Sequence, residues 1–343
     1  MLKELTQLWG VSGQEYDVAS YIAERVISYA DEIKMDAVGN LIVLKKGNGI
    51  SRKKIMVSAH SDEIGLCVVR ILENGLLKVK QIGGLSAFVV YMNRVRFKNG
   101  VAGVIACVKN IENIKDSEIR ELYVDIGVSS KEEAEKYISV GDCAVIEGGF
   151  EKLCNGRVLS KAIDNRIGCY ILMKLLREME IPYHDIYFTF TVQEEVGLRG
   201  ATVLAERIRP DLGIAVDITR AFDLPGEDYG TPVLGGGVAI KVSDGSVLCD
   251  VELTNVLKKV AKENQIPYQM DPLYAGGTDI GAIMKSSYGV RTLGLSIPTR
   301  YGHTPHSIID MQDVNACGEL LKVFLESEIK IVTEKIVKGS ESS

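Results

Sequence analysis

Short apolar runs recur along the chain, and several of them are followed at once by residues that can bind metal ions. The runs are rich in β-branched and aromatic residues, a composition typical of buried strands. The polar residues therefore stand where predicted strands end. The clearest runs and the residues that follow them are 55–59 with His60 and Asp62, 186–190 with Glu194 and Glu195, 212–216 with Asp217, and 292–297 with His303.

Segments with apolar residues at helical spacing lie between these runs. Near the N-terminus, Ser12 followed by Glu15 has the form of a capping box, which predicts that a helix begins there. Strands that alternate with helices predict an α/β fold, a three-layer α/β/α sandwich around a mostly parallel sheet. The other expected helices cover 167–179, 200–208, 251–264 and a longer stretch from about 312.

From about residue 70 the pattern changes to short alternating segments separated by turn signals such as Gly83-Gly84. This pattern of short segments and turns indicates a small β-rich, barrel-like domain with one short helix at 130–137. The block has no histidine and no carboxylate cluster at a strand end, so we assign it to interaction rather than chemistry. The predicted domains are 1–69 together with 156–343, and the inserted 70–155.

Composition narrows the class of protein. The 343 residues are 46% hydrophobic and 25% charged, which is typical of a soluble globular chain. The net charge of −6 argues against a nucleic-acid partner, which would favour a basic patch. The seven cysteines stand singly, and their odd number fits a reducing cytosol. With no signal peptide and no run of about 18 apolar residues, we expect a cytoplasmic protein that does not bind a membrane.

The residues after the strands suit a metal site. Ligands of open α/β sheets bind at the carboxyl ends of the strands. Two of the four histidines, His60 and His303, fall there together with several carboxylates. Such a set suits two divalent ions bridged by one carboxylate, which acidify a bound water and stabilise both reacting oxygens. Zinc accepts these ligands, and cobalt or manganese would also suit them.

Each candidate also has a structural interpretation. A histidine at a strand end is often simply hydrogen-bonded, and Asp164 or Asp217 could cap a helix. Their recurrence at one predicted edge favours a shared site. His184 has no such position, whereas His306 is close enough to His303 to be a rival ligand.

Five motifs follow one another along the chain: His60-Ser61-Asp62, Ala162-Ile163-Asp164-Asn165-Arg166, Glu194-Glu195-Val196-Gly197, Val216-Asp217 and Arg300-Tyr301-Gly302-His303. In this order they resemble metallopeptidase family 42, the glutamyl and tetrahedral aminopeptidases, which include members once called cellulase or endoglucanase. The resemblance spans nearly the whole chain, because the β-rich insertion falls where that family carries its dimerisation domain. One position departs from the pattern: Ser307 stands where relatives often have a glutamate.

The resemblance implies a ligand set for each of two divalent ions. One ion would be held by His60, Asp164 and Asp217. The other would be held by Asp164, Glu195 and His303, with Asp164 bridging the two.

The resemblance also implies roles for residues that are not ligands. Glu194 would be the general base that takes a proton from the metal-bridging water and passes it to the leaving amine. Asp62 would orient His60, as a partner of a metal-bound histidine usually does. A glycine-rich loop would lie near the substrate, or would be a plain turn; it contains Gly277, Thr278 and Asp279.

The sequence therefore predicts a metalloaminopeptidase with two divalent metal ions per subunit that hydrolyses N-terminal residues from short peptides. The resemblance implies dimers built through the insertion, and six dimers closing into a dodecamer. Two alternatives stay open: a metal-dependent deacylase or carboxypeptidase, and a glucan-associated protein with structural metals. A blocked N-terminus would abolish turnover by an aminopeptidase, and the adjacent Glu194 and Glu195 disfavour a purely structural site.

Overall fold

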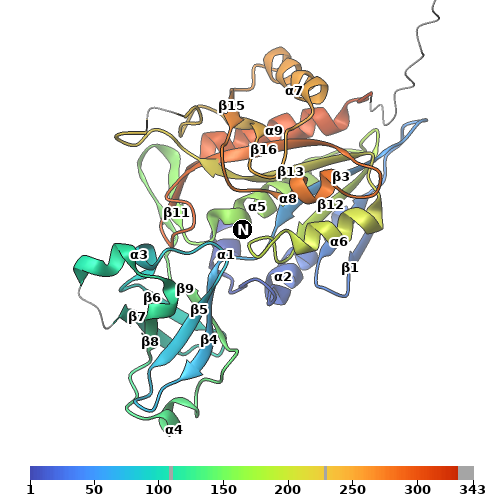
Figure 1. Cartoon of the computed structure of the whole chain (residues 1–343). Coiled ribbons are helices and arrows are strands. Elements are labelled where there is room, and N and C mark those ends of the chain that lie inside the picture. The colour runs from blue at the N-terminus through green and yellow to red at the C-terminus, as the bar shows by residue number, and fades with distance from the viewer. Residues whose placement is uncertain (108–110, 228–229, 331–343) are drawn as a thin grey trace, which may run out of the picture.

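The computed structural model describes residues 1–107, 111–227 and 230–330, and this part of the chain forms a large α/β domain and a smaller β-barrel (Figure 1). The barrel projects from one side of the large domain. It is inserted between β3 (Lys54–His60) and β10 (Glu151–Lys152). In the described ranges, no helix is both long enough and apolar enough to span a membrane.

Among the described residues, eleven strands of the large domain form one mixed sheet. Its centre is parallel, because β3 pairs with β12 and β13 on its two sides and β13 pairs with β16. The strands outside this centre add mainly antiparallel pairs. The remaining strands are β1 (Glu32–Met35), β2 (Leu41–Lys45), β11 (Arg157–Ser160), β12 (Asp185–Thr191), β13 (Leu212–Arg220), β14 (Val238–Ser243), β15 (Tyr268–Pro272), β16 (Arg291–Arg300) and β17 (Ser307–Asp310).

Helices cover both faces of this sheet, so the predicted three-layer sandwich is confirmed. Side chains of β3 alternate between the two layers: Ile55 and Val57 join the core under α5, whereas Met56 joins the cluster under α6. The alternation follows from the two-residue period of a strand that is buried on both faces. The helices are α1 (Leu2–Gln7), α2 (Tyr16–Val26), α5 (Ile163–Glu178), α6 (Arg199–Ile208), α7 (Val251–Glu263), α8 (Asp279–Met284) and α9 (Met311–Glu326).

The insertion is a closed barrel of six strands in the order β4-β5-β8-β7-β6-β9. Its strands lie between residues 65 and 146, whereas the sequence placed the insertion at 70–155. At the C-terminal boundary the difference arises because β10, which falls within 70–155, pairs with β11 of the large sheet. The barrel elements are β4 (Gly65–Ile71), β5 (Leu77–Ile82), α3 (Ala87–Val90), β6 (Arg94–Phe97), β7 (Ala102–Cys107), β8 (Leu122–Asp125), α4 (Lys131–Ala134) and β9 (Cys143–Ile146).

The N-terminal capping box predicted from Ser12 and Glu15 is wrong. The helix begins at Tyr16, but neither side chain caps it. The Oγ of Ser12 instead donates to Oδ2 of Asp62 at 2.6 Å, and Oε1 of Glu15 accepts the backbone N–H of Gln193 at 3.0 Å. Both side chains therefore hold loops of the predicted site, which is a long-range demand that a local capping pattern does not reveal.

Candidate metal centre

The predicted ligands gather at the carboxyl end of the parallel centre. His60 is the last residue of β3 and is buried. Asp217 lies inside β13 rather than after it, because that strand runs on to Arg220. Its Oδ1 nevertheless lies 3.8 Å from Nε2 of His60. The edge of the sheet therefore brings together residues that are far apart in sequence.

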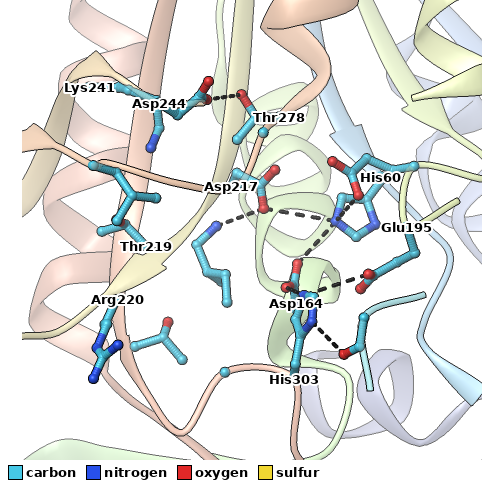
Figure 2. A pocket seen from close by; sticks show the side chains of 18 of the residues that line it. His60, Asp164, Glu195, Asp217, Thr219, Arg220, Lys241, Asp244, Thr278 and His303 are labelled. Atoms are coloured by element: carbon cyan, nitrogen blue, oxygen red, sulfur yellow. Dashed lines mark hydrogen bonds and ion pairs between the residues drawn. The ribbon is translucent and has the colours of Figure 1, made fainter. Parts of the chain in front are cut away.

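Asp164, in the first turn of α5, faces both histidines. Its Oδ1 lies 3.0 Å from Nε2 of His60, and its Oδ2 lies 3.1 Å from Nε2 of His303. In Figure 2, Asp164 lies between the two imidazoles. Each oxygen thus addresses a different histidine, which is the arrangement that a bridging carboxylate needs.

His303 lies in the turn that follows β16. Its Nδ1 donates to the carbonyl oxygen of Gly84 at 2.8 Å. Its Nε2 is therefore left facing the carboxylates, with Oε2 of Glu195 at 3.5 Å. Ser307, at the position where relatives often have a glutamate, donates to the carbonyl of Tyr301 at 3.1 Å and so closes the turn that carries His303.

Asp62 is fully buried beside His60 and connects several parts of the site. Its Oδ1 lies 3.3 Å from Nδ1 of His60 and accepts the backbone N–H of Glu194 at 3.1 Å. Its Oδ2 accepts the hydroxyl of Ser12 at 2.6 Å and the backbone N–H of Glu195 at 3.2 Å. Burial opposes ionisation of Asp62, but its contact with His60 and its other hydrogen bonds hold its pKa below the ordinary value.

Glu194 and Glu195 follow β12 in a tight turn, and both line the same cavity. The turn uses left-handed backbone at Gln193, with φ of 56°, and at Gly197, with φ of 118°. Oε2 of Glu194 lies 3.8 Å from Nε2 of His60. The buried Oε1 of Glu195 has no hydrogen-bond partner among the described residues. The two neighbours thus share one cavity in different surroundings.

Burial of several carboxylates together shifts their pKa values. Burial raises the pKa of Glu194 and of Asp217 well above the ordinary values. Burial and the neighbouring Asp164 raise the pKa of Glu195 to about 7. Burial would also raise the pKa of Asp164, but hydrogen bonds from His303 and His60 hold it below its ordinary value. The cluster therefore holds more negative charge than a buried site tolerates without cations.

The pKa values of the two histidines are also raised, but for a different reason. Burial alone would lower the pKa of His60, but Glu194 and Asp164 together raise it well above its ordinary value. The hydrogen bond to Asp164 raises the pKa of His303 to about 10. In both cases the surrounding carboxylates favour a positive charge at the imidazole position.

Two groups of side chains could each hold a metal ion, and within each group the ligand atoms lie within 4.8 Å of one another. The first group is His60, Asp164 and Glu195, and the second is His60, Glu194 and Asp217. His303 joins the first through its contacts with Asp164 and Glu195. The unpartnered Oε1 of Glu195 is a buried acceptor that a cation would satisfy. These nitrogen and oxygen donors fit divalent ions such as zinc, cobalt or manganese.

A cavity of about 670 Å³ opens beside the cluster. The metal-ligand candidates line one side of it, and Figure 2 shows Thr219, Lys241 and Thr278 on the other side. This volume is large enough to receive the end of a peptide chain or a side chain. Among the charged side chains of this far side, Lys241 is paired with the buried Asp271 at 2.7 Å.

The glycine-rich loop divides between the cavity and the core. Gly277 and Thr278 line the cavity, as predicted for a substrate loop. Asp279 is buried at the start of α8 and does not line it. Its Oδ2 accepts hydrogen bonds from the hydroxyls of Ser58 and Thr191, the latter at 2.7 Å. This carboxylate ties the ends of β3 and β12 together behind the site.

The assignment of the insertion to interaction alone is wrong. Gly84 belongs to the β-rich block, yet it lines the cavity and binds His303 through its carbonyl. Sequence reasoning missed it because a backbone acceptor carries no side-chain signal, and the paired Gly83-Gly84 was interpreted only as a turn. Gly83 is close to the site too, since a Cβ there would lie 3.1 Å from Oε2 of Glu195.

The two remaining histidines lie outside the cluster. His184 accepts the backbone N–H of Lys53 at Nδ1 and donates from Nε2 to the carbonyl of Ile329 at 3.1 Å. These contacts give His184 a structural role. Nε2 of His303 faces Asp164 and Glu195, whereas His306 lines a different cavity, so the structure favours His303 over its rival.

Comparison with known proteins agrees with this geometry. The family model described as M42 glutamyl aminopeptidase matches residues 39–320. A putative aminopeptidase of Acetivibrio thermocellus is 44% identical over 94% of this chain and 96% of its own. The aminopeptidase of the archaeon Desulfurococcus kamchatkensis superposes with a TM-score of 0.90 at 38% identity, covering 95% of this chain and 93% of its own. The TET1 peptidase of Pyrococcus horikoshii, which can assemble into a tetrahedron or a large octahedral shell, gives 0.83 at 32% identity, covering 94% and 98%.

Proposed function

Because the chain belongs to the family of M42 glutamyl aminopeptidases and is therefore a peptide hydrolase, we propose that it is a di-metal aminopeptidase that removes N-terminal residues from short peptides. The observation that carries the proposal is the position of Asp164, whose two oxygens face His60 and His303 separately. A carboxylate placed in this way suits two ions rather than one.

Five side chains would hold the ions. His60 and Asp217 would complete one set with Asp164, and Glu195 and His303 would complete the other. When bound, two such ions lower the pKa of a water from 15.7 to about 7 and polarise the scissile carbonyl. The candidates for the metal are zinc, cobalt and manganese, because all three accept this mixture of nitrogen and oxygen donors.

Glu194 is the proposed general base. It lines the cavity next to the candidate ligands. Among the described residues, the contact of its side chain is with Nε2 of His60 at 3.8 Å, so the carboxylate is available to accept a proton. Burial raises its pKa, which suits a group that must take a proton and then release it to the leaving amine. Neighbouring positive ions would bring that pKa back toward the working range of the enzyme.

Asp62 and Gly84 are the proposed positioning groups. Asp62 lies against Nδ1 of His60, and the carbonyl of Gly84 accepts from Nδ1 of His303. In each case the contact leaves Nε2 to face the carboxylates. Such partners of metal-binding histidines fix the tautomer and the direction of the ring.

Two features support action at a peptide end. The cavity contains several buried carboxylates, which would attract the free α-ammonium group of a substrate. Gly277 and Thr278 of the glycine-rich loop line the same cavity and would contact the residue that is removed. The substrate would therefore need an unblocked N-terminus.

The proposal also covers the oligomeric assembly of the protein and its location in the cell. The barrel at residues 65–146 would mediate a dimer, and six dimers would form a dodecamer. Two similar solved structures support an assembly of this kind, one a dodecamer and the other a TET1 peptidase that can assemble into a tetrahedron. The large domain, 1–69 with 156–343 in the sequence-based division, would carry the chemistry. The seven cysteines are all free thiols, which supports a location in the reducing cytoplasm.

The test is hydrolysis of a panel of aminoacyl-p-nitroanilides by metal-stripped protein, before and after addition of Zn²⁺, Co²⁺ or Mn²⁺. We expect turnover of unblocked substrates to return with metal, and two metal ions per chain by elemental analysis. N-acetylated versions of the same anilides are the matched control and should not be cleaved. The panel also reads out which N-terminal residue is preferred.

Other outcomes would identify the alternatives. Cleavage of the blocked substrates would indicate a deacylase or carboxypeptidase. Metal binding without hydrolysis of any peptide substrate, together with activity on a soluble glucan, would indicate the glucan-associated protein. One ion per chain at full activity would refute the di-metal mechanism and leave the aminopeptidase in place.

A further inference from the structure

Two cysteines lie opposite each other where the chain enters and leaves the barrel. Cys67 on β4 and Cys143 on β9 are direct partners in the antiparallel register of these strands. β4 is the first strand of the barrel and β9 is the last. The two thiols thus stand at the neck of the insertion, although 67 and 143 are far apart in sequence.

The backbone around the pair sets their separation. The adjacent Val68 donates its N–H to the carbonyl of Asp142 at 2.9 Å, so the hydrogen-bonded position lies next to the cysteines and they occupy a non-hydrogen-bonded one. At such positions Cα atoms lie about 4.5 Å apart and side chains are closest. Disulfides form at Cα separations of about 4.4–6.8 Å. The strands therefore hold the pair within bridging range.

The two sulfur atoms also point the same way. Sγ of Cys67 lies 3.7 Å and Sγ of Cys143 3.5 Å from one acceptor, the carbonyl oxygen of Gly141. Cys67 is partly exposed, whereas Cys143 is buried against Val11 and receives a hydrogen bond from Nε2 of Gln14 at 3.5 Å. The pair thus lies on the outer face of the barrel, where it meets the N-terminal segment of the large domain.

We propose that Cys67 and Cys143 are an oxidative modification site, which closes to a disulfide when a peroxide reaches Cys67. In the first step, the thiol of Cys67 and hydrogen peroxide give a sulfenic acid and one water. In the second, the sulfur of Cys143 bonds to the sulfur of Cys67, the S–O bond breaks, and a second water leaves. The two thiols lose two electrons and two protons in all, and the peroxide is reduced to two waters.

The surroundings decide which thiol reacts first. Cys67 is the accessible one. Cys143 is buried, so peroxide reaches it less readily than it reaches Cys67. Cys67 is therefore the sensing residue and Cys143 the resolving one.

The disulfide would enclose the barrel in a covalent loop. Such a loop removes conformational freedom from the unfolded barrel, and a long loop removes more of it than a short one. Oxidation should therefore raise the midpoint of the unfolding transition of the barrel by about 3–8 °C. Neither cysteine lines the cavity, so the proposal does not depend on the hydrolytic mechanism.

The experiment treats the metal-loaded protein with hydrogen peroxide, quenches it, and maps disulfide-linked peptides by mass spectrometry without reduction. We expect a peptide pair that links 67 with 143, a higher unfolding midpoint, and reversal of both by dithiothreitol. Cys143→Ser should stop at the sulfenic acid of Cys67, trapped by dimedone, and Cys67→Ser should form neither product. Cys154→Ser, at an exposed cysteine, is the matched control and should form the link normally.

Three results would overturn the proposal. The sulfenic acid of Cys67 could persist in the wild-type protein beside a free Cys143. Cys67 could instead link to a different cysteine. Cys67 could stay reduced while the exposed Cys154 is oxidised. The anilide assay on Cys67→Ser keeps this test separate from the proposed function, because that variant should hydrolyse peptides as the wild type does.

Discussion

Nδ1 of His303 and the carbonyl oxygen of Gly84 lie 2.8 Å apart, although one belongs to the large domain and the other to the inserted block. The contact determines which ring nitrogen of His303 is free to meet the carboxylates. The barrel therefore contributes to the candidate site itself. A purely dimerising insertion would not need to reach His303.

The first prediction follows from the space around Gly84. A Cβ at this residue would lie 2.9 Å from Nδ1 of His303, so Gly84→Ala must displace the imidazole or the loop. Loss of such a partner of a metal-binding histidine costs about 10–100-fold in activity or metal affinity. We expect kcat/KM and the occupancy of one of the two ions to fall together. Gly149→Ala, in the same block with nothing within 4 Å of its Cβ, is the control. Equal kinetics for the two variants would contradict the role of Gly84.

The second prediction separates the proposed base from the ligands. Glu194→Gln keeps the size of the side chain but cannot accept the proton, so kcat should fall by about 10²–10⁴-fold. Metal content should stay near the wild-type value, because Glu194 is not in the proposed ligand sets. Glu24→Gln, at an exposed position, should leave both quantities unchanged. Full activity of Glu194→Gln with both metals bound would remove the general-base role.

The sandwich could be predicted because each of its strands and helices leaves a pattern of apolar residues in its own short stretch of sequence. The apolar run before His60 is buried on both faces, and such runs are typical of central parallel strands. The gathering of the candidate ligands followed for the same reason, since strand ends meet at one edge. Asp217 was misplaced relative to its strand end because β13 continues through Ile218, Thr219 and Arg220, of which only the first is apolar. A polar strand extension and a loop have the same pattern.

The parts that the sequence did not predict depend on contacts between distant segments. Ser12 and Glu15 have the spacing of a helix cap, yet they serve Asp62 and the backbone of Gln193. Gly84 acts through its carbonyl, which any residue type possesses. Neither fact can be derived from spacing or composition, because each needs the loops of two separate elements in place.

The third prediction concerns the hydrogen bonds of Asp62. Asp62→Asn would replace one carboxylate oxygen by a donor, which cannot accept the N–H groups of Glu194 and Glu195 at both atoms. We expect kcat/KM to fall by about 10–100-fold, which is the usual cost of changing the hydrogen-bonding partner of a metal ligand. Ser12→Ala removes only one neutral donor to this carboxylate and should cost less. The order would be contradicted if Ser12→Ala were the more damaging change.

The fourth prediction concerns Arg166, whose side chain is fully buried two residues after Asp164. Its guanidinium donates to the carbonyls of Ser61 and Leu5, each at 2.7 Å, and so joins the N-terminal segment to the loop after His60. Arg166→Met leaves these carbonyls unpaired, and we expect a loss of about 3–5 kcal/mol in the free energy of unfolding.

Denaturant unfolding measures this loss. The control is Arg207→Met on the exposed side of α6, which should change the free energy of unfolding by no more than about 0.5 kcal/mol. Gly10→Ala should weaken the same junction, because its Cβ would lie 2.7 Å from Nη2 of Arg166. An Arg166→Met protein as stable as the Arg207 variant would show that the N-terminal segment is held by other contacts.

The last prediction concerns pH. The pKa of Glu195 is raised to about 7 and that of His303 to about 10, so in the folded protein without metal both groups favour their protonated forms. The contact of protonated His303 with Asp164 stabilises the fold at low pH and is lost as pH rises through about 10, whereas burial penalises ionised Glu195 and so lowers stability as pH rises through about 7. The metal-stripped protein should therefore lose stability as pH rises from 4.5 to about 7 through Glu195 and from 6.5 to about 10 through His303.

Metal binding must displace the same protons, so the apparent affinity for zinc should rise with pH by up to about tenfold per pH unit for each proton released. The gain in unfolding temperature on adding zinc should then be larger at pH 8 than at pH 6. Titrations in metal-buffered solution at these two pH values measure the affinity, and thermal unfolding measures the gain. An affinity that is flat or falls with pH would mean that Glu195 and His303 are not both ligands, because two groups that bind a cation in place of a proton cannot do so without this dependence.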